Sequence, residues 1–142
     1  SRYCDQDYLI DKGNDYSQGG KYQLAIDEFS IAIQKNPSFP NTYNTRGIHY
    51  ALLGQHQQAI QDYDKAIQLD PNIAIAYANR GRSYYGLGQY QLAIRDFDKA
   101  IQLYPNQPWA YLNRGDSYRN LGQYAKSDAD NAKACSLDSQ YC

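Results

Sequence analysis

The sequence of 142 residues has no Met, a single Trp and three Cys, and it contains only short apolar runs. A membrane-spanning helix needs roughly 20 consecutive apolar residues, so we expect no insertion into a membrane. Basic residues are not in excess, because 14 Lys and Arg stand against 15 Asp and Glu and the formal net charge is −1. Nucleic acids and anionic membranes normally select a basic surface. We therefore expect no nucleic-acid partner.

Patterns for catalysis, cofactors and metals are missing as well. Cys4, Cys135 and Cys142 are too few for a disulfide scaffold and are not spaced as paired metal ligands. His49 and His56 belong to no Cys/His or Ser/His/Asp constellation, and no phosphate-binding glycine loop is present. We predict no enzyme activity, no metal and no cofactor, and we place His49 on a helix surface.

A repeat of 34 residues runs through nearly the whole chain. One set of prolines, two sets of glycines, one set of alanines and one set of aromatic residues recur at this interval. They are Pro37, Pro71 and Pro105; Gly13, Gly47, Gly81 and Gly115; Gly20, Gly54, Gly88 and Gly122; Ala32, Ala66, Ala100 and Ala134; and Phe29, Tyr63 and Phe97. Four copies fit, over residues 6–39, 40–73, 74–107 and 108–141. Such a period predicts stacked units of supersecondary structure.

The pattern resembles the tetratricopeptide repeat family. The resemblance implies an all-α fold, an α-solenoid of four helix-turn-helix repeats in a right-handed superhelix, which we expect to form one domain over residues 1–142. In the third copy, residues 74–87 and 90–103 carry apolar side chains at helical spacing, in agreement with this fold. Gly88 suits the left-handed end of the first helix. We expect Gly81 to let the second helix approach closely, opposite Ala93.

The seventh position of each copy departs from the family, which usually has Leu there. The copies instead carry Lys12, Arg46, Arg80 and Arg114, and an acid follows each sixteen residues later, as Glu28, Asp62, Asp96 and Asp130. One interpretation is a row of cations for an acidic ligand. We favour the other, a partly buried ion pair between the two helices of each copy, because repeated ion pairs more often belong to the scaffold.

The ends of the chain differ from its middle. The second helix of the fourth copy has Asp128, Asn131 and Cys135 where the inner copies have apolar residues, so it is interpreted as a polar cap that ends the stack. Cys135 and Cys142 lie close in sequence, and we predict that they form a disulfide if the chain is exported, with Cys4 free. The chain begins at Ser1, which indicates a processed or excised form. The compartment stays open between the cytoplasm and export after removal of a leader.

The resemblance implies a binding site on the concave face, formed mainly by the first helix of each copy. The candidate peptide-binding residues are Asn44, Ile75, Asn79, Arg82, Tyr85, Trp109, Asn113 and Arg119. Asn79 and Asn113 lie one repeat apart and resemble the asparagine ladder of some family members, since an amide can pair with a peptide unit of any sequence. Solvation of an exposed face is the alternative for each Asn. Arg82 and Arg119 would attract an acidic residue or a C-terminal carboxylate.

Two functions from different classes follow. The first is a non-catalytic protein-interaction module that binds an extended peptide or a partner helix in the concave groove. The alternative is a scaffold that self-associates, weakly or within an assembly, through the solenoid ends or the convex face. A chaperone-tail clamp of the kind known in the family is rejected, because Ile10, Thr45, Ile75 and Trp109 stand at positions where that clamp needs particular polar or basic residues.

Overall fold

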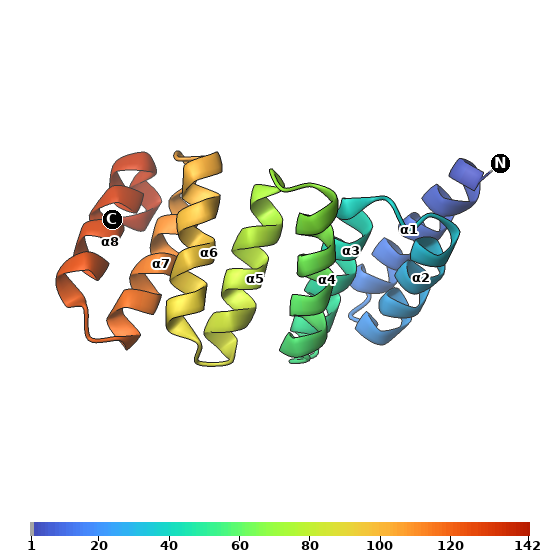
Figure 1. Cartoon of the computed structure of the whole chain (residues 1–142), viewed down its shortest axis with the longest axis horizontal. Helices are drawn as coiled ribbons and strands as arrows, with labels where there is room; N and C mark the ends of the chain where they lie inside the picture. Colours follow the sequence, from blue (N-terminus) through green and yellow to red (C-terminus); the bar gives the residue numbers. More distant parts are fainter. Residues whose placement is uncertain (1) are drawn as a thin grey trace. The chain divides into compact units, whose positions relative to one another are not determined.

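The computed structural model describes the backbone of residues 2–142 and the side chains from Gln6 onward. The described residues form eight α-helices and one short 3-10 helix, with no strand (Figure 1). Their bounds are α1 (Arg2–Gln18), α2 (Tyr22–Lys35), α3 (Pro40–Leu52), α4 (His56–Leu69), α5 (Ala74–Gly86), α6 (Tyr90–Leu103), α7 (Pro108–Asn120), α8 (Tyr124–Leu137) and η1 (Ser139–Tyr141). Each copy holds one helix pair, which confirms the predicted all-α class and its helix-turn-helix repeats.

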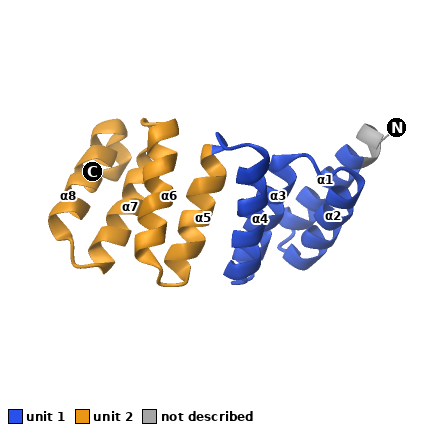
Figure 2. Cartoon of the chain, in the orientation of Figure 1, with its two compact units in different colours: residues 1–73 blue, residues 74–142 orange. Residues whose placement is uncertain are grey.

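The chain divides into two compact units, residues 1–73 and residues 74–142 (Figure 2). Each unit contains two consecutive copies, so the division falls on a repeat boundary. In the first unit α1 packs on α2, α2 on α3 and α3 on α4; in the second, α5 packs on α6, α6 on α7 and α7 on α8. The expectation of a single domain over residues 1–142 stays a prediction.

In the core of each unit, a buried aromatic ring packs against a glycine among Ala and Ile side chains. Phe29, Tyr63 and Phe97 have exposed fractions of 0%, 1% and 0%. A Cβ on Gly81 would lie 2.9 Å from Phe97 Cε1 and 3.2 Å from the carbonyl oxygen of Ala93. The expected close approach of the second helix to Gly81 is therefore confirmed. The atoms nearest to Gly81 belong to the Phe97 ring, and the carbonyl of Ala93 is slightly farther away.

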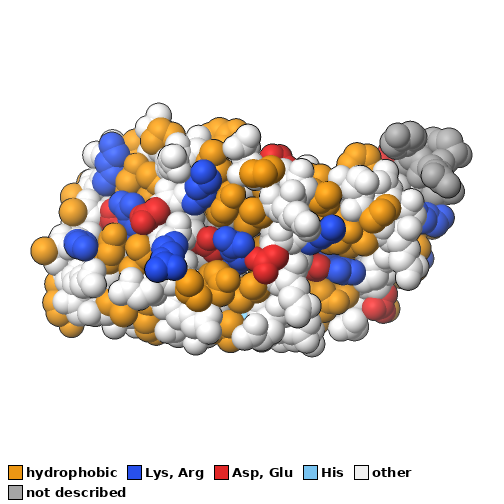
Figure 3. Space-filling model, in the orientation of Figure 1, with side chains coloured by type: hydrophobic (Ala, Val, Ile, Leu, Met, Phe, Trp, Pro, Cys, Tyr) orange, Lys and Arg blue, Asp and Glu red, His pale blue; other side chains and the backbone are white. Residues whose placement is uncertain are grey.

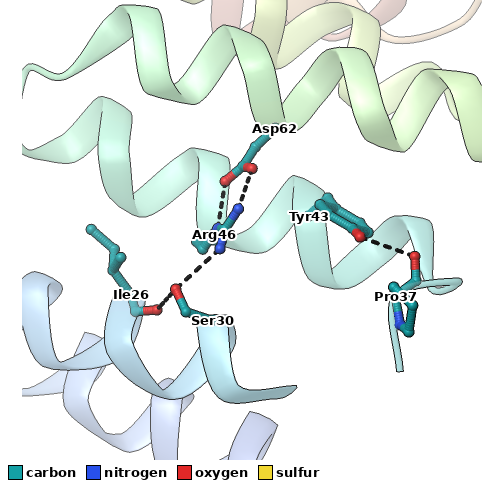
Figure 4. A network of polar contacts seen from close by, with 6 residues as sticks. All are labelled: Ile26, Ser30, Pro37, Tyr43, Arg46 and Asp62. Carbon is teal, nitrogen blue, oxygen red and sulfur yellow. Dashed lines mark hydrogen bonds and ion pairs between the residues drawn. The ribbon is translucent and has the colours of Figure 1, made fainter. Parts of the chain in front are cut away.

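The turns follow from the recurring glycines and prolines. Gly88 has a φ of +74°, its N–H donates to the carbonyl of Tyr85 at 2.9 Å, and the N–H of Gln89 donates to that of Tyr84 at 2.8 Å. This is the left-handed helix end that only Gly adopts without strain. Between helix pairs, the Tyr43 hydroxyl donates to the carbonyl of Pro37 at 3.0 Å (Figure 4). Each turn thus has a fixed backbone path.

The C-terminal segment folds back onto α8. Cys135 and Cys142 form a disulfide with a Cα–Cα distance of 4.7 Å, so the predicted bridge is present. Asp128 is exposed and Asn131 is half-buried, in agreement with a polar end on α8. The prediction for Cys4 falls on a side chain outside the described residues.

We expect Gly81→Ala to destabilise the protein. Overpacking a core typically costs about 1–3 kcal/mol, and the better helix propensity of Ala returns only about 1 kcal/mol, so the free energy of unfolding should fall. Denaturant titration followed by circular dichroism measures this change. Gly19→Ala is the matched control, because its Cβ would meet nothing closer than 3.6 Å. A Gly81→Ala variant as stable as the control would contradict the close packing.

Protein isolated from an oxidising compartment should contain the bridge between Cys135 and Cys142, because the fold already holds the two Cα atoms within disulfide range. Peptide mapping by mass spectrometry without reduction identifies the linked fragments. An intramolecular bridge that includes Cys4 would contradict this prediction, and Cys135→Ser with Cys142→Ser provides the unbridged control.

Candidate functional site

The cations at the seventh repeat position are engaged inside the fold. The Arg46 guanidinium donates to both carboxylate oxygens of Asp62, at 2.8 and 2.7 Å, from α3 to α4 (Figure 4). Arg80 makes the same bidentate pair with Asp96, and Arg114 makes it with Asp130. Lys12 pairs with Glu28 at 3.0 Å. The sequence-based prediction of an ion pair between the two helices of each copy is confirmed.

Two of these arginines also reach the preceding copy. Arg46 Nη1 donates to Ser30 Oγ on α2 at 3.0 Å, and Ser30 in turn donates to the carbonyl of Ile26 (Figure 4). Arg114 Nη1 donates to Asp98 on α6 at 2.8 Å. One guanidinium therefore connects three helices, which is a structural role.

The surroundings hold these arginines in their charged form. The hydrogen bonds that Arg46 donates to Asp62 raise the pKa of Arg46 above its usual value, although burial opposes the shift. The pKa of Arg114 is raised for the same reason by Asp130, and further by Asp98. Tyr50 lies 5.7 Å from the Arg46 guanidinium, measured to the ring centroid. A ligand would have to displace a bidentate carboxylate to reach Arg46, Arg80 or Arg114, so we assign these three arginines a structural role.

The prediction that His49 lies on the helix surface is wrong. His49 is 4% exposed, with ring centroids 5.2 Å from Phe29 and 6.0 Å from Tyr22. Its Nδ1 lies 2.7 Å from the carbonyl oxygen of Thr45, to which it donates. His49 on α3 therefore faces α2 of the preceding copy, and its ring fills the space between the two helices.

A cavity of about 230 Å³ lies in the second unit. It is lined by Arg82 and Tyr85 of α5, Phe97 of α6, and Asn113 and Asp116 of α7. Arg82 and Asp116 are exposed, and Tyr85 is 37% exposed. Three of the sequence-predicted residues, Arg82, Tyr85 and Asn113, are thus brought together.

Hydrogen bonds order the wall of this cavity. The Tyr85 hydroxyl accepts from Asn120 Nδ2 of α7 at 3.0 Å, and its ring meets Tyr90 edge-on at 5.3 Å between centroids. Asn113 Nδ2 donates to the carbonyl of Trp109 at 2.8 Å. This bond fixes the orientation of the Asn113 side chain and therefore of its amide oxygen. The cavity is therefore preformed by α5 and α7.

The other predicted site residues lie outside the cavity. Ile75 on α5 is 46% exposed, whereas Asn79 is 9% exposed. Trp109 is half-buried and its Nε1 donates to Gln107 Oε1 at 3.2 Å. Arg119 is exposed near the end of α7. Asn44 belongs to the first unit and is 7% exposed.

Sequence reasoning missed Phe97 as a wall of the cavity and gave Asn120 no specific role. Phe97 occupies a core position of the repeat, and its spacing carries no sign that a cavity adjoins it. Asn120 is the last residue of α7, and its hydrogen bond to Tyr85 joins residues that are 35 positions apart in the sequence. No local pattern encodes that pairing.

The face drawn in Figure 3 carries charges of both signs, with Lys and Arg side chains next to Asp and Glu within each unit. No helix within residues 2–142 is both long and apolar enough to cross a membrane. In the described part of the chain, no group of three or more His, Cys, Asp or Glu could hold a metal ion.

Two tetratricopeptide repeat models match the sequence, one over residues 40–73 and 74–107 and the other over residues 97–129. The chain belongs to the tetratricopeptide repeat family. Among curated protein sequences, none matches it.

Several solved structures share the fold. MamA (residues 41 to the end) from Desulfovibrio magneticus RS-1 is 24% identical, with a TM-score of 0.89 over 96% of this chain and 79% of that one. The TPR domain of Arabidopsis OM64 is 27% identical, with a TM-score of 0.81 over 84% of this chain and 98% of that one. The first TPR of Spaghetti (RPAP3), solved with the HSP90 peptide SRMEEVD, is 27% identical, with a TM-score of 0.81 over 83% and 94%.

The two acids bound by Arg114 should differ in their effect on stability. Asp130 is 7% exposed and bidentate, whereas Asp98 is 52% exposed and accepts one bond. We expect Asp130→Asn to lower the free energy of unfolding by about 3 kcal/mol and Asp98→Asn by less than about 1 kcal/mol. Denaturant titration of both variants measures the difference. Equal, small losses would mean that the pair is not structural and would return the row to the candidate ligand sites.

Proposed function

We propose that the chain is a non-catalytic module that binds an extended segment of a partner protein along the concave faces of α5 and α7. Family membership supports the coarser statement, a protein-interaction module. The finer statement rests on one observation, the preformed cavity with Arg82, Tyr85, Asn113 and Asp116 in its wall. Exposed polar and aromatic groups converging on one cavity are the usual form of a recognition site.

The residues in and around the cavity would have different roles in binding the partner segment. Trp109 is the large, half-buried side chain on α7, and it would serve as the anchor because aromatic side chains dominate binding energy. Asn113 would hold the backbone of the segment through its amide oxygen. Ile75 adds exposed apolar surface on α5. The burial of Asn79 and Asn44 gives them a smaller part than the sequence predicts.

Charged groups at the rim would set orientation. Arg119 is exposed on α7 and would attract an acidic group of the partner, though an exposed pair contributes little net affinity. The RPAP3 domain was solved with an acidic HSP90 peptide. This chain has Trp109 and Asn113 at positions where the family's chaperone-tail clamp needs Lys and Arg, so we expect a different class of segment.

Self-association is the second candidate. A shallow apolar depression of about 320 Å³ lies where the helix turns of the second unit meet, lined in part by Tyr90, Leu92 and Leu121. Light scattering at increasing concentration tests it. A monomer at all concentrations would remove this candidate.

We expect Trp109→Ala to weaken the binding of a partner by ~2 kcal/mol or more, because it removes the anchor of the groove. A pull-down with the whole chain as bait identifies a partner, and titration calorimetry then measures its affinity for the variants. Asn113→Ala should weaken binding of unrelated partner sequences alike, since it contacts only backbone.

Lys99→Ala on α6 is the control variant, because Lys99 bonds only to Gln102 among the described residues. A partner that binds Trp109→Ala as tightly as the unaltered chain, but loses affinity for Lys99→Ala, would move the functional surface from the concave to the opposite face.

A further inference from the structure

The cavity of the second unit contains two opposite charges that do not bond to each other or to any other side chain. Among residues 6–142, the Arg82 guanidinium and the Asp116 carboxylate have no ion-pair or hydrogen-bond partner; Asp116 contributes only its backbone carbonyl, to Asn120. This sets them apart from the arginine row, where every Asp partner lies within 2.8 Å of a guanidinium nitrogen. The wall therefore holds one unpaired cation, Arg82, and one unpaired anion, Asp116, among the described residues.

The size of the cavity limits its occupant. Small-molecule sites in proteins typically enclose roughly 300–1,000 Å³, and 230 Å³ is smaller than that range. One large side chain of an extended segment fits the space better. Tyr85 and the buried Phe97 supply apolar surface for the stem of such a side chain.

The charges then limit the chemistry at its tip. A carboxylate drawn to Arg82 would lie against Asp116, and an ammonium drawn to Asp116 would lie against Arg82. Each charged tip therefore meets one attractive and one repulsive neighbour in a single small space. A primary amide meets neither repulsion, because its carbonyl oxygen accepts from Arg82 while its NH₂ donates to Asp116.

We propose that this cavity binds the carboxamide of a Gln side chain in the partner segment. The proposal rests on the function proposed above and names the residue that its central cavity selects. Gln is preferred to Asn because its longer stem covers Tyr85 before the amide reaches the two charges. The amide oxygen of Asn113 accepts an N–H of the adjoining backbone, as proposed above.

The structure thereby departs from the sequence-based expectation at Arg82. The sequence predicts an acidic residue there, since Arg82 and Arg119 lie in the same half of the groove. Asp116 shares the cavity with Arg82, whereas Arg119 is not in its wall. The proposal therefore leaves an acid only for Arg119, outside the cavity.

A library of random linear peptides displayed on phage, selected on the whole chain, tests the proposal. Selected peptides whose affinity falls with Trp109→Ala should share a Gln at one position. In synthetic peptides measured by fluorescence anisotropy, replacing that Gln with Glu or Lys should weaken binding at least about tenfold. The Lys99→Gln variant is the surface control and should bind as the unaltered chain does.

Charge variants of the protein supply a readout that a merely structural role would not produce. Asp116→Asn should make the Glu peptide the better ligand, and Arg82→Gln should do the same for the Lys peptide. Exchanging both charges, Arg82→Asp with Asp116→Arg, should change the affinity of the Gln peptide by less than about threefold. The reason is that the carboxamide can rotate by about 180° and exchange the positions of its oxygen and its NH₂.

The outcomes separate the two proposals. Groove-dependent peptides that prefer Glu or Lys in the unaltered chain, or show no preference that follows the charges, overturn the Gln site and leave the groove function standing. If the library yields no binder, or only binders indifferent to Trp109→Ala, the groove function fails and the Gln site fails with it. Circular dichroism of each variant checks that the helices remain folded.

Discussion

The ion pair between the seventh-position cation and the acid sixteen residues later is the contact on which the packing of each helix pair depends. Arg46 joins α2, α3 and α4 through Ser30 and Asp62, and Arg114 joins α6, α7 and α8 through Asp98 and Asp130. An apolar side chain could fill the same space, but it would leave the buried carboxylates without a partner, which is costly. The repeat therefore keeps both charges together, and within each unit an arginine also bonds to the preceding helix pair.

This use of charge determines where a ligand can be recognised. Bidentate bonds occupy the seventh-position arginines, so a partner can meet only cations that the fold does not engage. In the second unit Arg82 lies two residues after Arg80 on α5, and that step turns its side chain away from Asp96 and toward the cavity. The same repeat thus separates the ion-paired Arg80 from Arg82, which is unpaired among the described residues, by their place on the helix.

The sequence predicted the parts of the structure that recur every 34 residues. The helix pairs, the left-handed Gly88 and the ion pairs such as Arg80 with Asp96 are confirmed, because each depends on a fixed position within one copy. The buried His49 and the cavity were not predicted. Both depend on which side chains meet between neighbouring copies. The position of a residue within the repeat indicates the direction of its side chain, but it does not indicate the size of the side chain that it meets.

The final copy shows how such a difference in size acts. Where Gly81 faces the ring of Phe97, Gly115 faces Asn131, and a Cβ there would lie 3.1 Å from its Oδ1. The missing ring lets α8 present Asp128 and Asn131, whose burial against a further helix would need new hydrogen bonds. A partner covering that end would have to satisfy these polar groups. The cavity lined by α5, α6 and α7 instead presents its polar groups beside the rings of Tyr85 and Phe97. Under the proposed function, docking therefore carries a lower cost of desolvation at that cavity than at the polar end of α8.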